Sequence, residues 1–312
     1  MKIDDVYNLW ATEKSKHVKY STICAYSLIY TNHIHPTLGD MEVEDIRKKD
    51  VQNFINNELA NGLSVKTVKD MVIVLKMIAN YAASELEFNI NTTWKLYWPT
   101  KNLTKQELPP VYSNSEFKKI VNTCITYPSA INLGILLTIC SGMRIGEVCA
   151  LQFKDIDIDK KILTVSKTIE RVYSVHDGVR KTELIISEPK TASSHREIPI
   201  ISDAFSLTKK FYNVANPDYY VCSLTEKPIE PRVFRNHYAK FIKEKCKLNH
   251  VIRFHGLRHT FASLLIENKV DVKTVASILG HSDISTTLNT YVHPSELSKR
   301  KSMTSSIKKI LK

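Results

Sequence analysis

The sequence predicts a mainly α-helical protein with a small antiparallel β-sheet, arranged as a helical N-terminal bundle followed by an α+β domain. Three observations support this fold class. Apolar residues recur at helical spacing through most of the chain. Strand-like alternation is confined to the stretch between Asp155 and Ile200. A proline-containing stretch separates the two parts, which at 312 residues fits two domains better than one.

The first domain is expected to span residues 1–98 and to be entirely helical. A helix from Thr22 to Ile34 is followed by a second, Ile46 to Leu59, whose apolar residues lie roughly on one face. Ser64 is a suitable N-cap for a third helix, Val65 to Ser84. Six apolar residues of this helix are expected to face inward, namely Val68, Met71, Val72, Leu75, Ile78 and Ala79.

Residues 99–112 are expected to form the linker, because the stretch WPTKNLTKQELPP contains three prolines and favours an extended connection. The second domain, 113–312, begins at a capping box formed by Ser113 and Glu116. It is expected to close with an amphipathic tail helix at about 302–312.

Within the second domain, helices are expected at about 115–126 and 129–140, with Gly142 as a left-handed cap. The segments KILTVSKTIERVY, TELIISE and REIPI then alternate like three strands of one short sheet. Helices are expected again near 202–213 and 231–247. The stretch DIDID at 155–159 is interpreted as a surface turn and not as a metal site.

The charge distribution indicates an anionic partner, nucleic acid first. The formal net charge is +12 and the pI is about 9.2. Residues 1–100 hold 11 Lys+Arg and 12 Asp+Glu, so the excess of positive charge belongs to the remaining 212 residues. A few lysines of the bundle and linker are nevertheless candidates for contacts with DNA phosphates: Lys16, Lys19, Lys66, Lys69 and Lys101.

Cysteine usage and hydropathy exclude several other classes of protein. The six cysteines form no CxxC pair and are not joined by histidines at zinc spacing, so neither a metal site nor a disulfide framework is expected. The polar N-terminus does not resemble a signal peptide. The longest apolar run, 130–140, is too short to cross a bilayer. These features predict a cytoplasmic protein with reduced thiols and no membrane partner.

The stretch 253–291 contains the main candidates for chemistry. His255, Arg258 and His259 stand at i, i+3 and i+4, so on a helix their side chains share one face. His281 and Tyr291 follow. Three further candidates lie upstream, namely Arg144, Glu147 one turn after it, and Lys190 in a turn between two predicted strands.

This set of side chains can cleave a phosphodiester without a metal ion or other cofactor. Arg144 and Arg258 offer planar forks to phosphate oxygens, and Tyr291 is the candidate nucleophile. Lys190 is the candidate acid for the leaving 5′ oxygen. The two histidines, His255 and His281, hold the phosphate or move the phenolic proton. Glu147 is expected to fix a cationic neighbour. Phosphate loops, HExxH and GxSxG motifs are absent from the sequence.

Five motifs in this order, SGMRIGE, EPKTASSHREIPI, HGLRHTFAS, LGHSDISTT and NTY, closely resemble the tyrosine recombinases, or phage integrase family. The resemblance covers nearly the whole chain. It implies a core-DNA-binding bundle and a catalytic domain. It also implies that Arg144, Lys190, His255, Arg258, His281 and the nucleophile Tyr291 are catalytic, with Glu147 in support. His259 is interpreted as a structural or supporting residue.

The resemblance implies a site-specific recombinase that exchanges DNA strands through a 3′-phosphotyrosine intermediate, without metal or ATP. The expected partners are double-stranded DNA with specific core sites, three further protomers in a homo-tetramer, and accessory DNA-bending or excisionase proteins. A bacterial or mobile-element source and a nucleoid location are implied. Many phage integrases carry an additional arm-site-binding domain, and the bundle here starts almost at Met1.

Two alternatives remain open at this stage. A type IB topoisomerase shares the chemistry but relaxes DNA without exchanging strands. A non-catalytic DNA-binding regulator would use the same scaffold without the reaction. The short, motif-dense domain favours a recombinase over the first, and the intact residue set argues against the second.

Overall fold

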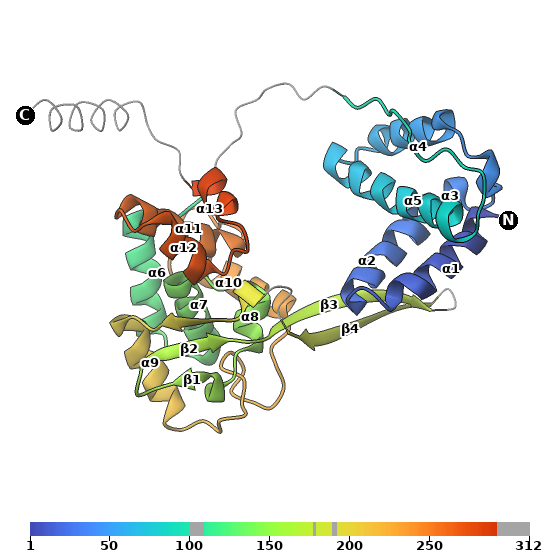
Figure 1. The fold of residues 1–312 in the computed structure, drawn as a ribbon. Coiled ribbons are helices and arrows are strands. Elements are labelled where there is room, and N and C mark those ends of the chain that lie inside the picture. Colours follow the sequence, from blue (N-terminus) through green and yellow to red (C-terminus); the bar gives the residue numbers. More distant parts are fainter. Residues whose placement is uncertain (100–108, 177–178, 189–191, 292–312) are drawn as a thin grey trace, which may run out of the picture. The chain divides into compact units, whose positions relative to one another are not determined.

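The computed structural model describes residues 1–99, 109–176, 179–188 and 192–291 (Figure 1). The chain divides into two compact units. The first comprises Met1–Gln106 and Arg171–Glu183, and the second comprises Glu107–Glu170 and Leu184–Lys312. The expected tail helix at 302–312 and most of the expected linker lie outside the described residues.

The first unit is a helical bundle in which the three expected helices occur in the expected order, preceded by a helix that was not expected. Its elements are α1 (Ile3–Ser15), α2 (Tyr20–Ile29), the π-helical turn η1 (Tyr30–Ile34), α3 (His35–Leu38), η2 (Val43–Asp45), α4 (Lys48–Ala60) and α5 (Val65–Glu85). The expected single helix from Thr22 to Ile34 instead begins at Tyr20 and changes to a π-helical turn after Ile29. Pro36 lies in the first turn of α3, where its missing N–H is tolerated.

The core of this unit forms along α5. Ser64 caps the helix by accepting a hydrogen bond from the Thr67 amide, and all six residues expected to face inward are buried. The expectation that residues 1–98 are entirely helical is wrong for 86–98, which form no helix. This stretch is fixed by other means. Trp94 is buried, and the Gln52 side chain exchanges two hydrogen bonds with the backbone of Tyr97.

The second unit contains the remaining helices, which pack around one large apolar core and one small apolar cluster. They are α6 (Asn114–Thr126), α7 (Ala130–Ser141), α8 (Ile145–Ala150), α9 (Ser202–Tyr212), α10 (Pro231–Glu244), α11 (His255–Glu267), α12 (Val272–Leu279) and α13 (Ile284–Tyr291), with short 3-10 turns at η3 (Phe153–Asp155) and η4 (Ala192–Ser194). The capping box of Ser113 and Glu116 at the start of α6 is confirmed.

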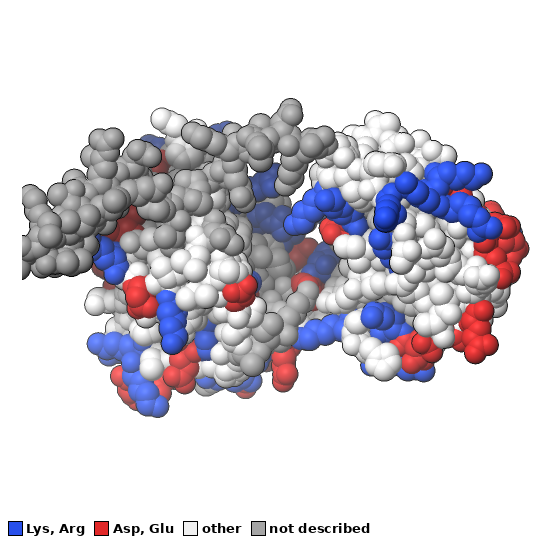
Figure 2. All heavy atoms as spheres, turned by 45° about the horizontal axis from the view of Figure 1, so that its top comes forward, with Lys and Arg blue, Asp and Glu red and all other residues white. Residues whose placement is uncertain are grey.

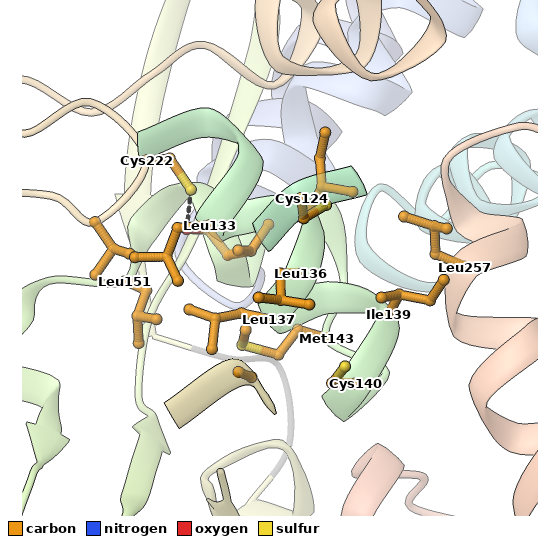
Figure 3. Packing of buried hydrophobic residues seen from close by; sticks show 14 of the residues in the cluster. Cys124, Leu133, Leu136, Leu137, Ile139, Cys140, Met143, Leu151, Cys222 and Leu257 are labelled. Carbon is orange, nitrogen blue, oxygen red and sulfur yellow. Dashed lines mark hydrogen bonds between the residues drawn. The ribbon is translucent and has the colours of Figure 1, made fainter. Parts of the chain in front are cut away.

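Helix α7 is the central element of this core. Ten of its twelve residues are buried, and Figure 3 shows its leucines and Ile139 packed among Cys124, Cys222 and Leu257 from other segments. A helix that is apolar on all sides is stable only when other elements surround it. None of the helices in the described part of the chain is long and apolar enough to cross a membrane.

The strands form two sheets and not the single sheet expected. In the first, β1 (Ile156–Asp157), β2 (Ile162–Val165) and β5 (Arg196–Pro199) pair antiparallel in the order β1-β2-β5. In the second, β3 (Thr168–His176) pairs with β4 (Val179–Ser187). The run KILTVSKTIERVY is therefore interrupted after Val165. There the Lys167 ammonium donates to the Gln152 side-chain oxygen (2.7 Å) and lies 3.5 Å from a carboxylate oxygen of Asp155.

Candidate active site

The Arg258 side chain is buried at a place where two helices end. It lies on the first turn of α11 and is 2% exposed. Its two terminal nitrogens donate to the carbonyl oxygens of Gly142 and Leu279, each at 2.8 Å. Burial, followed by repulsion from Arg144, lowers the pKa of Arg258 to about 9, so the guanidinium is still charged at neutral pH.

Arg144 stands at the N-cap of α8 and is more accessible than Arg258. Its Nη1 donates to Glu147 Oε1 (2.8 Å), and its Nη2 donates to the Gly280 carbonyl (3.3 Å). Its backbone amide donates to Glu147 Oε2 (2.8 Å), which closes the first turn of the helix. These bonds hold the guanidinium in one orientation while 37% of the side chain stays exposed.

Left-handed glycines end the two helices whose carbonyls receive the arginines. Gly142 follows α7 with φ +69°, and Gly280 follows α12 with φ +67°. The first was expected from the sequence as a cap. A side chain at either position would clash, since a Cβ on Gly142 would lie 2.6 Å from Leu279 Cδ2 and one on Gly280 would lie 2.9 Å from the Ser193 carbonyl oxygen.

Glu147 was expected to fix a cationic neighbour. It bonds to Arg144 and also to a second arginine, Arg196, which the sequence analysis missed. Arg196 on β5 donates through Nη1 and Nη2 to both Glu147 oxygens (3.1 and 2.9 Å). Its Nε donates to the Ile278 carbonyl (2.6 Å). Glu147 is 4% exposed and Arg196 8%. Burial alone would raise the pKa of Glu147, but Arg196 and Arg144 together hold it below the usual range.

Two neutral histidines stand beside the arginines. Burial, followed by the charges of Arg258 and Arg144, lowers the pKa of His281 to about 4 and also lowers the pKa of His255. The Nδ1 atom of His281 lies 2.7 Å from the hydroxyl of Thr287 on α13. Both imidazoles are therefore uncharged at neutral pH, and each keeps a nitrogen for a hydrogen bond.

These side chains line one cavity of about 500 Å³, hereafter the arginine cavity. It is formed entirely by the second unit and brings together four of the predicted catalytic residues and the supporting carboxylate. Its lining consists of Arg144, Glu147, Thr168, Glu170, Ser194, His255, Arg258, Gly280, His281, Ser282 and Thr286. Two guanidiniums and two imidazoles around a small concave site suit a tetrahedral, multiply charged oxyanion. No group of three His, Cys, Asp or Glu side chains that could hold a metal ion is found among the described residues.

Tyr291 lies close to this cavity but is not part of its lining. It is the last residue of α13 and packs against the small cluster of Ala262, Val275 and Leu279. Its hydroxyl is 2.6 Å from Nδ1 of His259. Burial raises the pKa of the phenol, and the nearby charges of Arg258 and Arg144 act in the opposite direction.

The remaining predicted residues fall into two groups. Lys190 and Lys101 lie outside the described residues. The other lysine candidates belong to the first unit, where Lys and Arg share the surface with Asp and Glu (Figure 2). Lys16 pairs with Glu13 (2.7 Å), and the Lys69 ammonium lies 5.2 Å from the ring centre of Trp98. Lys19 is the N-cap of α2, and Lys66 is exposed in the first turn of α5.

Family models match both parts of the chain. The model of the phage integrase family matches residues 101–297, and the model of the phage integrase N-terminal SAM-like domain matches residues 2–59. Among curated proteins, a tyrosine recombinase XerC-like protein of Caldanaerobacter subterraneus is 30% identical over 312 residues, covering 93% of this chain and 79% of the relative. The ICEBs1 integrase of Bacillus subtilis is 25% identical, with 85% and 72% covered.

Solved structures share the fold. The Tn1549 transposon integrase, determined in complex with transposon right end DNA, matches with a TM-score of 0.77 at 22% identity, covering 98% of this chain and 100% of that one. A lambda integrase tetramer bound to a Holliday junction matches with a TM-score of 0.65 at 18% identity, covering 95% and 80%. The expected fold class, mainly helical with small sheets, is confirmed.

Proposed function

This chain belongs to the phage integrase family of tyrosine recombinases, which cleave and rejoin DNA strands, and we propose that its arginine cavity receives the phosphate that is attacked. One observation carries the proposal. Arg144 and Arg258, which are 114 positions apart in sequence, are both fixed by hydrogen bonds and line the same cavity with two neutral histidines. Donors that are oriented before the substrate arrives stabilise developing negative charge without reorganisation.

In the proposed reaction, the Tyr291 oxygen attacks the phosphorus, its phenolic proton passes to His255 or His281, and the bond from phosphorus to the 5′ oxygen breaks. The products are a 3′-phosphotyrosine and a free 5′ hydroxyl, and the proton that this leaving oxygen needs comes from Lys190. The 5′ hydroxyl of a partner duplex then attacks the phosphotyrosine and releases the phenol. Because the covalent bond conserves the energy of the phosphodiester, the exchange needs neither ATP nor a metal ion.

The proposed substrate is double-stranded DNA with specific core sites. The basic excess of residues 101–312 and the lysine candidates Lys16, Lys19, Lys66, Lys69 and Lys101 supply backbone contacts. We propose a core-binding domain at 1–98, a linker at 99–112 and a catalytic domain at 113–312. The DNA affinity of each separately expressed part tests these boundaries, and a 113–312 fragment without any DNA affinity would refute them.

The synaptic complex is proposed to be a homo-tetramer, by similarity to the lambda integrase tetramer. The tail helix at about 302–312 would pack on a neighbouring protomer, and accessory DNA-bending or excisionase proteins would direct the outcome. The proposed location is the bacterial cytoplasm, at the nucleoid. A chain truncated after residue 301 should bind DNA but recombine poorly, and normal recombination by the truncated chain would contradict the proposed contact.

A suicide substrate nicked beside the cleavage position tests the chemistry directly. Wild type should form a covalent protein–DNA adduct, also in EDTA, and Tyr291→Phe should form none. Tyr127→Phe is the matched control, because Tyr127 is 48% exposed on the same unit and outside the site. An adduct with Tyr291→Phe, or cleavage that stops on chelation, would contradict the proposal.

Two alternative functions predict different results. Relaxation of any supercoiled plasmid, whatever its sequence, would indicate a type IB topoisomerase. Binding to a cognate site without any adduct would indicate a DNA-binding regulator.

A further inference from the structure

The hydrogen bond between Tyr291 and His259 has no role in the reaction derived above. The two side chains come from α13 and α11, their ring centres are 5.5 Å apart, and the phenol oxygen lies 2.6 Å from Nδ1. His259 is in turn in edge-to-face contact with His255, with ring centres 4.6 Å apart and planes at 87°. His255 lines the arginine cavity, whereas His259 and Tyr291 do not.

The protonation states assign the direction of this bond. Burial, followed by repulsion from His255 and Arg258, lowers the pKa of His259 to about 4, so its imidazole is neutral at neutral pH. The phenol keeps its proton because burial raises its pKa. With the single imidazole proton on Nε2, Tyr291 donates its O–H to Nδ1 of His259. An imidazole of such low basicity accepts a hydrogen bond from the phenol but is too weak a base to take its proton efficiently.

The contact therefore occupies the atom that has to reach phosphorus. In the absence of DNA the phenol oxygen is satisfied, protonated and directed at a side chain behind the cavity lining. A nucleophile that is already bonded elsewhere must give up that bond before it attacks, and the cost adds to the barrier.

We propose that His259 is a positioning residue, which holds the Tyr291 phenol out of the arginine cavity until a phosphate occupies it. The inference rests on the proposed function of Tyr291 as the nucleophile. It gives the neighbouring histidine a restraining role instead of a share in catalysis. Nδ1 is the atom that matters, because it is the imidazole nitrogen that contacts the phenol oxygen.

Amide variants at position 259 test the role of that single atom. The side-chain amide of His259→Asn lies near the position of Nδ1 and keeps an acceptor there, whereas that of His259→Gln reaches the position of Nε2. Asn has about the same helix propensity as His and Gln a slightly higher one, and position 259 is half-buried beside a cavity of about 580 Å³ that accommodates both amides. His259→Leu removes the acceptor altogether.

Single-turnover cleavage of the suicide substrate is the first measurement. His259→Asn should cleave at the wild-type rate. His259→Gln and His259→Leu should cleave about two- to tenfold faster, because loss of one neutral hydrogen bond shifts the equilibrium of the phenol by about that factor. DNA affinity should be the same in all four proteins. Slower cleavage by the Gln and Leu variants would overturn the proposal. A loss of more than about a hundredfold in every variant would overturn it too, by making His259 a general base.

A second measurement needs no DNA and separates the two proposals. With 3-fluorotyrosine at position 291, the solvent isotope shift of the ¹⁹F signal reports the exposure of the ring. The shift should be small in wild type and His259→Asn and larger in His259→Gln. Equal shifts in all three would refute the restraint even if the adduct forms. A restrained phenol in a protein that never forms an adduct would refute the proposed function alone.

Discussion

Replacing Arg196 with methionine should destabilise the second unit strongly. The substitution leaves the Glu147 carboxylate 4% exposed and deprived of its bidentate partner, with Arg144 as its remaining cation. Removing one member of a buried ion pair typically costs about 3–5 kcal/mol, since the other charge stays buried without compensation. The Ile278 carbonyl also loses the donor that ties the end of α12 to β5.

The distribution of tryptophans provides an internal control for this experiment. All three, at positions 10, 94 and 98, belong to the first unit, so their fluorescence reports that unit, whereas far-UV circular dichroism reports both. Arg196→Met should shift the circular dichroism transition in urea and leave the fluorescence transition in place. Arg232→Met, at an exposed arginine on α10, should leave both unchanged.

The charge argument is tested by neutralising both partners. The double variant Arg196→Met with Glu147→Gln should recover about 1–3 kcal/mol relative to Arg196→Met alone, because the buried charge is gone. The reasoning would be refuted if the free energy of unfolding of Arg196→Met were within about 1 kcal/mol of wild type, or if the double variant were less stable than Arg196→Met.

Three further predictions concern stability and thiol reactivity. In urea unfolding, Gly142→Ala should lower stability by more than the ~1–2 kcal/mol that a left-handed backbone costs a residue with a Cβ, because that Cβ would also lie 2.7 Å from Phe261. Gly62→Ala is the control for the backbone cost alone, since Gly62 has φ +86° and open space around it. The six cysteines are buried, which raises the pKa of each thiol, so a thiol reagent such as DTNB should react only as the protein unfolds. The pKa of His259 and of His281 is about 4 in the folded chain, against an ordinary value of 6.5, so the unfolded chain binds more protons between pH 4 and 6.5. The stability of the folded chain should therefore fall as the pH drops from 6.5 to 4. In pH-dependent melting, His281→Gln should reduce the slope of this fall.

Much of the fold follows from local sequence signals. The capping box at Ser113, the apolar face of α5 and the left-handed glycine after α7 are each specified by a few neighbouring residues, and all three are confirmed. The single sheet predicted from alternation is wrong, since the strands divide into two sheets after Val165. At that point Lys167 bonds to Gln152, fifteen residues earlier, a contact that no period-two pattern reveals.

The candidate site was only partly accessible from sequence. Arg144, His255, Arg258 and His281 lie together as the motif pattern suggested. Arg196 was missed because it occupies a regular position in an alternating strand, and its partner Glu147 is 49 residues away. The bond between Tyr291 and His259 depends on how α13 packs against α11, which the spacing of either helix does not determine.

The carbonyls that hold Arg258 have a consequence for how this enzyme tolerates change. Gly142 and Leu279 stand where α7 and α12 end, so the negative poles of two helices meet the guanidinium. Helix α7 is almost wholly buried. A substitution in the apolar core that shifts α7 by a fraction of an ångström therefore also shifts the Gly142 carbonyl to which Arg258 donates. Core packing and phosphate recognition are thus coupled through the peptide backbone. Conservative substitutions in the core, far from the substrate, should therefore change the rate of DNA cleavage.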